Sequence, residues 1–491
     1  MTARWRRIAL LCVLAAWIGV AWRQAVKSLP PGLHVASMIC EQPAGEVTFL
    51  ADITAADAYG RPTVSQGIFD AVLQVVRTAR RFIVLDYSGF GADVATGTPQ
   101  RRPSAALTDA LIEARRSAPD LRVLFITDPA NESYGAARSP ELQLLRAAGV
   151  EVVLAELDRL RDSNLAYSSL WRLALRWWDT PSGPMGVATR RLNFKSDGRR
   201  LVIADDGRGG LAAVVGSATP RDSESGWSNV AARASGGALE ALLASELAVA
   251  QFSGWAGSSE PFLAPSGAPT RALPGCASAT TAALPAGGAS NELSRLQVLT
   301  EGAIRAELLT RLDTTLRGDR IDVAVFHLAE RGVVESLLAA ARRGVDVRLI
   351  LDPNEAATSG GTAGLPNQPV ASELVARSGG AIRVRWYRTH GERFHAALVL
   401  IHGAQRTWLT LGSAQLTRRA LDDYNLEANL AIELAPGSVL AQQAQQYFDT
   451  LWANRASLGV EYTADYAVFA NPAQSDYWLG RLLEGAGLAM F

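Results

Sequence analysis

The chain has 491 residues and a formal net charge of zero, long enough for two or three domains with large cores. Hydrophobic residues make up 48% of it and charged residues 20%, a composition that excludes an intrinsically disordered protein. Because basic residues are not in excess, nucleic acid is not an expected partner, and any anionic ligand needs a local site.

Residues 8–22 form an apolar run that follows Arg4, Arg6 and Arg7. Such a run is typical of a membrane anchor or a signal peptide. Because no small-residue cleavage site follows closely and more positive charge precedes the run, the sequence favours an uncleaved anchor within residues 1–30. The body would then lie in the periplasm, outside an inner membrane of bacterial type. Secretion after cleavage is the alternative.

The three cysteines leave one question of pairing open. Cys12 lies inside the apolar run, whereas Cys40 and Cys276 either form a disulfide in an oxidising compartment or stay as two thiols. No group of Cys and His residues has the spacing of a metal site, so we expect neither a metal nor another cofactor.

The rest of the chain repeats one α/β unit. The first copy comprises 67–87, 106–129, 142–157, 201–205 and 212–219, and the second comprises 305–328, 333–354, 371–387 and 396–415. Helical apolar spacing alternates with short buried strands, which predicts mostly parallel sheets with helices on both faces. We expect domains at 47–254 and 292–455, a linker rich in small residues at 255–291 and an extension at 456–491.

Residues 394–429 carry the most informative motif. A strand led by His395 ends at His402, a second strand runs into Gly412-Ser413-Ala414-Gln415, and Glu427 follows. This segment resembles the second catalytic motif of the phospholipase D superfamily, His-x-Lys-x4-Asp followed by Gly-Ser-x-Asn. Ala397 stands where the family has lysine, and His402 where it has aspartate.

The resemblance implies an α/β fold of two pseudo-repeated sandwich domains that share a central cleft, preceded here by the hydrophobic helix. It also implies a chemistry that needs no metal. In the family one histidine attacks phosphorus to form a phosphohistidine, a second protonates the leaving alcohol, and two lysines hold the phosphate oxygens.

In motif two the resemblance gives His395 the role of nucleophile or of general acid and base. Glu427 matches the downstream acid that orients a histidine, and Ser413 and Gln415 match groups that bind phosphate or the motif residues. His327, at the end of the predicted strand 323–327, falls where family members carry groups that line the cleft.

Motif one is matched to residues 198–205. Gly198 then replaces the histidine, Arg200 replaces the lysine, and Asp205 keeps the acid. A second register would put Asn193 and Lys195 at the histidine and lysine positions. Ser217 lies in the matching Gly-Ser corner, Arg200 could hold phosphate as a bidentate fork, and Lys195 could add a second cation.

The histidines restrict the mechanism. The chain has five, and none lies between residues 35 and 326. The family's two-histidine mechanism therefore cannot run within one chain. A single-histidine variant remains, in which His395 attacks and Asp205 or Glu427 supplies the proton.

Three functions follow. The first is a membrane-anchored phosphodiesterase or phosphatidyltransferase that acts on phospholipid headgroups. The second is an inactive member that binds a phosphorylated ligand or a partner. The third, a nucleic-acid phosphodiesterase, is disfavoured by the neutral charge and the anchor. The sequence does not predict the oligomeric state.

Overall fold

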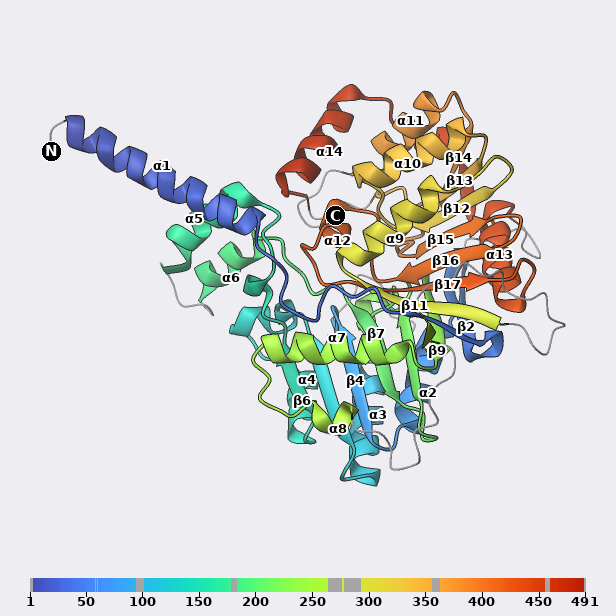
Figure 1. Cartoon of the computed structure of the whole chain (residues 1–491), viewed down its shortest axis with the longest axis horizontal. Coiled ribbons are helices and arrows are strands. Elements are labelled where there is room, and N and C mark those ends of the chain that lie inside the picture. Colours follow the sequence, from blue (N-terminus) through green and yellow to red (C-terminus); the bar gives the residue numbers. More distant parts are fainter. Residues whose placement is uncertain are drawn as a thin grey trace.

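The computed structural model describes residues 3–57, 59, 61–93, 101–177, 183–263, 276–277, 293–355, 363–454 and 460–489. They form two large mixed sheets, one from each predicted repeat, and an amino-terminal helix (Figure 1). The predicted fold class is confirmed. The domain boundaries stay a prediction, and most of 255–291 lies outside the described residues.

The first sheet has the strand order β3-β2-β9-β8-β7-β4-β5-β6. Its strands are β2 (Val47–Ala56), β3 (Pro62–Ser65), β4 (Phe82–Tyr87), β5 (Arg122–Thr127), β6 (Glu151–Leu154), β7 (Arg200–Asp205), β8 (Leu211–Gly216) and β9 (Asn229–Ser235). Its helices are α2 (Ile68–Thr78), α3 (Pro103–Ser117), α4 (Pro140–Ala147), α5 (Leu165–Leu173), α6 (Pro184–Arg191), α7 (Leu239–Phe252) and α8 (Glu260–Leu263).

The second sheet has the order β10-β1-β11-β17-β16-β15-β12-β13-β14-β18. Its strands are β1 (Ile39–Pro43), β10 (Cys276–Ala277), β11 (Leu293–Thr300), β12 (Arg320–Val325), β13 (Asp346–Leu351), β14 (Ile382–Tyr387), β15 (Ala397–His402), β16 (Thr407–Gly412), β17 (Ala428–Leu434) and β18 (Thr463–Asp465). Its helices are α9 (Gly302–Asp313), α10 (Arg331–Arg342), α11 (Asn367–Arg377), α12 (Arg418–Leu421), α13 (Val439–Trp452) and α14 (Gln474–Ala486).

Only part of each sheet is parallel, so the prediction of mostly parallel sheets is wrong. The strands β4, β5 and β6 are parallel to one another, as are β12, β13 and β14, whereas β7–β8 and β15–β16 are antiparallel. The reason is connection length. Helices join the parallel strands, but turns of only a few residues join the other pairs, and a short turn permits only an antiparallel hairpin.

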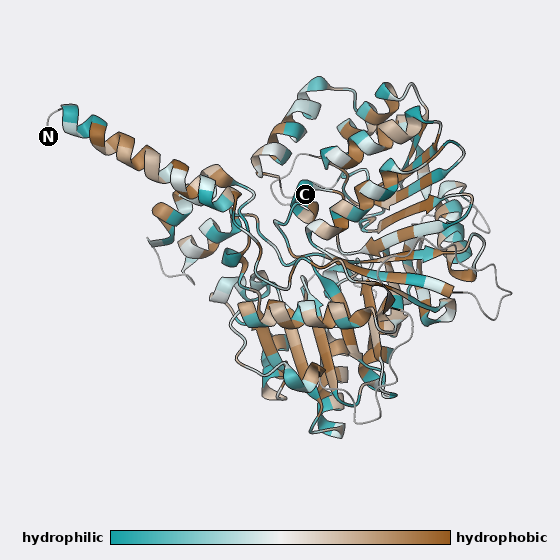
Figure 2. Ribbon diagram, in the orientation of Figure 1, coloured by the Kyte–Doolittle hydropathy of each residue, from teal (hydrophilic) through white to brown (hydrophobic). Residues whose placement is uncertain are grey.

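The two sheets face each other across one hydrophobic core. Side chains of β7 and β8 pack there with side chains of β15, β16 and β17, and α7 and α13 complete the core. The helices α2, α3 and α4 cover the outer face of the first sheet, and α9, α10 and α11 cover that of the second. Figure 2 shows the apolar strands inside these helix layers.

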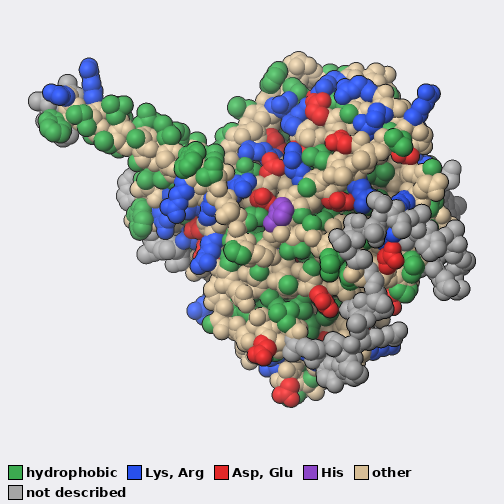
Figure 3. All heavy atoms as spheres, in the orientation of Figure 1, with side chains coloured by type: hydrophobic (Ala, Val, Ile, Leu, Met, Phe, Trp, Pro, Cys, Tyr) green, Lys and Arg blue, Asp and Glu red, His purple; other side chains and the backbone are tan. Residues whose placement is uncertain are grey.

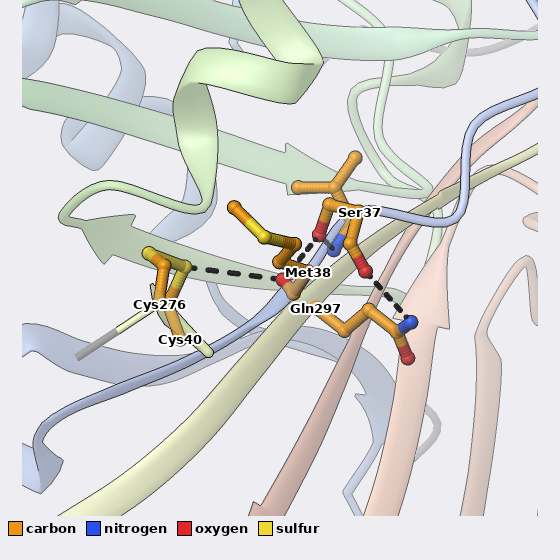
Figure 4. Close-up of a disulfide and its surroundings, with 6 residues drawn as sticks. Ser37, Met38, Cys40, Cys276 and Gln297 are labelled. Atoms are coloured by element: carbon orange, nitrogen blue, oxygen red, sulfur yellow. Dashed lines mark hydrogen bonds between the residues drawn. A yellow bond between two sulfur atoms is a disulfide. The ribbon is translucent and has the colours of Figure 1, made fainter. Parts of the chain in front are cut away.

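The amino-terminal helix α1 (Ala3–Ala25) projects from the body (Figure 1). An 18-residue window within Arg4–Ala25 has a mean hydropathy of 1.7 and is almost entirely exposed, so this helix is long and apolar enough to cross a membrane. After α1 the chain runs to the second sheet, where Cys40 of β1 is disulfide-bonded to Cys276 of β10 (Figure 4).

Reduction of this disulfide is expected to lower the melting temperature. The bond closes a loop with a sequence separation of 236 residues, and a loop of that size contributes roughly 3–5 kcal/mol through the entropy of the unfolded chain. Thermal melts with and without reductant would measure the shift. The exposed Cys12 is the control, because Cys12→Ser should melt at the wild-type temperature. An unchanged melt after full reduction would contradict the prediction.

Candidate active site

The two motifs meet where the sheets face each other, in a pseudo-symmetric arrangement. The Gly198 N–H donates to the Leu426 carbonyl at 2.8 Å, and the His395 N–H donates to the Ser228 carbonyl at the same distance. Each acceptor directly precedes the downstream polar residue of the other repeat. Gly198 therefore occupies the place in the first repeat that His395 occupies in the second, as the preferred register predicts.

Glu427 fills the space that a side chain at residue 198 would take. A Cβ built on Gly198 would clash with both carboxylate oxygens of Glu427. The carboxylate is buried and accepts a hydrogen bond from the Ser413 hydroxyl. Burial raises the pKa of Glu427 to about 7, although the positive charge of Arg200 opposes the shift. At neutral pH this carboxyl is therefore close to half-protonated.

His395 is a buried, neutral imidazole. Its Nδ1 lies 3.1 Å from the Ser217 carbonyl, which can only accept, so we assign the proton to Nδ1 and a free lone pair to Nε2. Burial lowers the pKa of His395 well below its ordinary value, and the charges of Arg200 and Arg393 act in the same direction. A neutral ring with an open Nε2 is the form that a nucleophile needs.

Two arginines lie beside this histidine. The half-buried Arg200 donates to the Ser88 hydroxyl and to the Ser413 carbonyl, both at 3.2 Å. The Arg393 guanidinium lies over the rings of Trp227 (4.9 Å) and Phe326 (5.5 Å). Within the part of the chain that the structure describes, neither forms an ion pair with a carboxylate. The sequence reasoning missed Arg393, whose only signal was a cation two residues before the motif histidine.

The same aromatic rings pack on His395. Trp227 and Phe326 each lie 5.1 Å from it, and Phe326 stacks on His327 at 3.9 Å. Burial, with the charge of Arg393, lowers the pKa of His327 to about 3, so this side chain is neutral. The structure thus places His327 and His395 against the same ring.

The Gly-Ser corners shape the site through local hydrogen bonds. The Ser217 hydroxyl bonds to Asn229 at 3.1 Å, as the Ser413 hydroxyl bonds to Glu427. The Gln415 amide accepts from the N–H groups of Phe326 and His327 and donates to the Ala396 carbonyl. The structure places these three side chains near His395, where their hydrogen bonds hold neighbouring residues of the protein.

Two predicted residues lie elsewhere. Asp205 is at the far end of β7, where its carboxylate accepts from the N–H groups of Arg80, Arg81 and Phe82. Lys195 is buried in the first domain, where its ammonium donates to two carbonyls and pairs with Asp162 at 2.5 Å. Both are fully engaged in holding loops, so this geometry argues against Asp205 as a proton donor and against Lys195 as a phosphate ligand.

Comparison with known proteins gives one family match. The family described as "Cardiolipin synthase, PLD-like domain" matches residues 309–452, and no curated protein sequence matches the chain. A phosphatidylserine synthase from Haemophilus influenzae Rd KW20 has a similar structure, with a TM-score of 0.53 and 9% sequence identity over 92% of this chain and 96% of that one. This likeness shows the fold alone.

Two further structures align less well. Nuc from Salmonella typhimurium, a phospholipase D family member, is 22% identical over 35% of this chain and 98% of its own, with a TM-score of 0.28. A polyphosphate kinase from Porphyromonas gingivalis is 12% identical over 90% of this chain and 53% of its own, with a TM-score of 0.41. The motif and the match over 309–452 identify the second repeat as a domain of the phospholipase D type, and the paired sheets of the whole chain share the fold of the similar synthase.

Proposed function

We propose that the cleft binds the phosphodiester of a phospholipid headgroup between Arg200, Arg393 and His395. Two guanidinium groups without a carboxylate partner in the described chain offer charge-assisted hydrogen bonds to phosphate oxygens. In this proposal Arg393 replaces the cation that is lost at Ala397. The headgroup assignment is supported by the matched cardiolipin synthase-like domain and by the amino-terminal helix.

We also propose that the site turns this phosphodiester over with a single histidine. His395 Nε2 attacks phosphorus, the bond to the leaving oxygen breaks, and the Glu427 carboxyl gives that oxygen its proton. The Glu427 carboxylate then takes a proton from water or an acceptor alcohol, whose oxygen attacks the phosphohistidine and releases His395. The observation that carries this proposal is the position of the Glu427 carboxyl, which fills the empty place beside Gly198.

The pH dependence of kcat/KM tests the role of Glu427. The first step needs protonated Glu427, whose pKa is about 7, so kcat/KM should fall as the pH rises through 7. His395 is already neutral at lower pH, so no loss should appear near pH 6.5. Glu427→Gln should lower kcat/KM by roughly 10²–10³-fold and flatten the profile. An unchanged descending limb in Glu427→Gln would eliminate Glu427 as the acid.

A second candidate is phosphate-ligand binding without turnover. It is favoured by the loss of the motif-one histidine at Gly198 and of the motif-two lysine at Ala397. In that case Arg200→Ala and Arg393→Ala would weaken ligand binding, whereas no variant would change a turnover rate that is already zero.

We further propose that α1 anchors the chain in an inner membrane of bacterial type and that the body lies in the periplasm. The disulfide between Cys40 and Cys276 supports an oxidising compartment for the body.

A further inference from the structure

The amino-terminal helix is not an isolated rod, because its last two turns pack on α5. The Trp17 indole N–H donates to the Ala166 carbonyl at 3.0 Å, and Gln24 at the end of α1 is buried. Figure 1 shows α1 running beside α5 before it projects beyond the body. We call α5, the turn Leu175–Trp177 and α6 the helical lobe.

The helical lobe exposes large apolar side chains. Trp177 is 73% exposed, and the leucines on either side of it are also exposed; they are Leu170, Leu173 and Leu192. By contrast, Trp171 is buried and bonds to Thr189, so the lobe has its own small core. The exposed residues are therefore not needed to hold the lobe together, and they make it unusually apolar for a surface in water.

The lobe carries an excess of positive charge, although Arg172 pairs with Asp162 just before it. Residues 165–192 contain four arginines and a single acid, Asp179. Arg176 lies over the Trp177 ring at 4.7 Å, and Arg190 and Arg191 end α6. Figure 3 shows Lys and Arg side chains gathered where α1 meets the body, next to the hydrophobic cover of α1. Exposed Trp and Leu combined with Arg are typical of a segment that lies in a membrane interface.

The residues that follow α1 fix the position of the lobe along the axis of α1. The Lys27 ammonium donates to the carbonyls of Asp158 (2.9 Å) and Leu160 (3.3 Å), and the Arg161 side chain donates to the Lys27 carbonyl at 3.0 Å. The chain after α1 is thus bonded to the loop that leads into α5. If α1 crosses a membrane, these bonds therefore fix the depth at which the lobe lies in that membrane.

We propose that the helical lobe is seated in the interface of an anionic lipid bilayer, beside a membrane-spanning α1. The inference deepens the proposed membrane location, on which it rests. The 22 residues of the span measure about 33 Å at 1.5 Å per residue, close to the thickness of a bilayer core. The contact begins at Trp17, eight residues before Ala25, so the lobe reaches about 12 Å into the bilayer, near the depth of an interfacial helix.

Depth-dependent fluorescence quenching tests this seating in the full chain. Cys12→Ser removes the free thiol, Leu173→Cys carries an environment-sensitive dye, and vesicles of phosphatidylglycerol and phosphatidylcholine carry nitroxide-labelled lipid. Leu316→Cys is the matched control, an exposed leucine in the turn after α9. We expect quenching at residue 173 to exceed that at residue 316 by several-fold. Equal quenching at the two positions would overturn the proposal.

A second arm tests the lipid charge. In Arg176→Gln/Arg191→Gln, quenching at residue 173 should fall in anionic vesicles, because each arginine near such a surface contributes about 5-fold to binding. In vesicles of phosphatidylcholine alone the same variant should match its parent. Equal quenching of variant and parent in anionic vesicles would eliminate the anionic part of the proposal. Phosphodiester turnover in detergent separates this result from a failure of the cleft, because it needs no bilayer.

Discussion

Replacing His395 with alanine is expected to abolish phosphodiester turnover, with a loss of roughly 10⁴-fold or more in kcat. The variant removes the atom that bonds to phosphorus, and losses of this scale follow when an enzyme loses its nucleophile. The substrate pair would be a chromogenic phosphodiester and phosphatidylglycerol vesicles, with the chain in detergent for the first. Because His395 is buried among aromatic rings, circular dichroism and a thermal melt should accompany each assay.

The control for this prediction is His34→Ala, which removes an exposed histidine that lies 3.7 Å from the Asp423 carboxylate. It should keep the wild-type rate. Turnover that survives in His395→Ala would disprove the single-histidine route. A wild-type protein that binds phosphate with no turnover would leave the ligand-binding alternative as the function of this cleft.

Replacing Arg199 with alanine is expected to destabilise the chain by about 3–5 kcal/mol, the largest stability effect that we predict. Arg199 is fully buried and pairs with Glu246 of α7 and with Glu301 of the second repeat, each at 2.7 Å. The guanidinium therefore joins the two repeats behind the active site. Without it both carboxylates would be left buried and unpaired, and urea unfolding would measure the cost.

The loss of unfolding free energy in Arg199→Ala should grow as the pH rises. Burial raises the pKa of Glu301 above its ordinary value, and the charge of Arg199 opposes that rise, so without the arginine the folded-state pKa of Glu301 lies higher still. Stability is then lost as the pH rises above the unfolded pKa, because the unfolded chain binds fewer protons than the folded one. The stability of the variant should thus be closer to that of the wild type at pH 5 than at pH 8. An equal deficit at both values would mean that lost packing, and not charge, is responsible.

A surface arginine gives the matched comparison. Arg377 contacts Glu335 and Glu373 at 2.6 and 2.7 Å, but both it and Glu335 are exposed. Arg377→Ala should therefore cost less than about 1 kcal/mol. A comparable loss in the two variants would show that burial does not govern these ion pairs.

The fold was predictable because the sequence repeats itself. Asp128-Pro129 follows β5 and Asp352-Pro353 follows β13, which are equivalent strands of the two repeats, and the two aspartates make equivalent hydrogen bonds. Asp128 accepts from the Asp197 N–H and Asp352 accepts from the Phe394 N–H, both at 2.8 Å. Each carboxylate thus fixes the residue just before Gly198 or His395. Such a role depends on contacts over 40 or more residues, which spacing along the chain does not show.

The errors within the site have the same physical origin. Lys195 and Arg393 both lie a few residues from a motif, and the sequence offers no reason to prefer one over the other. The structure separates them, because Lys195 pairs with Asp162 whereas Arg393 lies over aromatic rings and, among the described residues, forms no ion pair. Asp205 keeps the family residue type, yet the length of β7 carries it away from Arg200. Which cation stays unpaired is decided by tertiary contacts.

The pairing of β1 with β11 bears on how the chain is made. Cys40 of β1 pairs with Leu296 of β11. The strand β1, which follows α1, therefore has no partner until β11 is synthesised about 250 residues later. At about 5–20 residues per second the wait is on the order of 10–50 s. All strands of the first sheet emerge meanwhile, between Val47 and Ser235. The nascent chain thus completes the strands of its first sheet while β1 still has an unpaired edge and Cys40 has no disulfide partner.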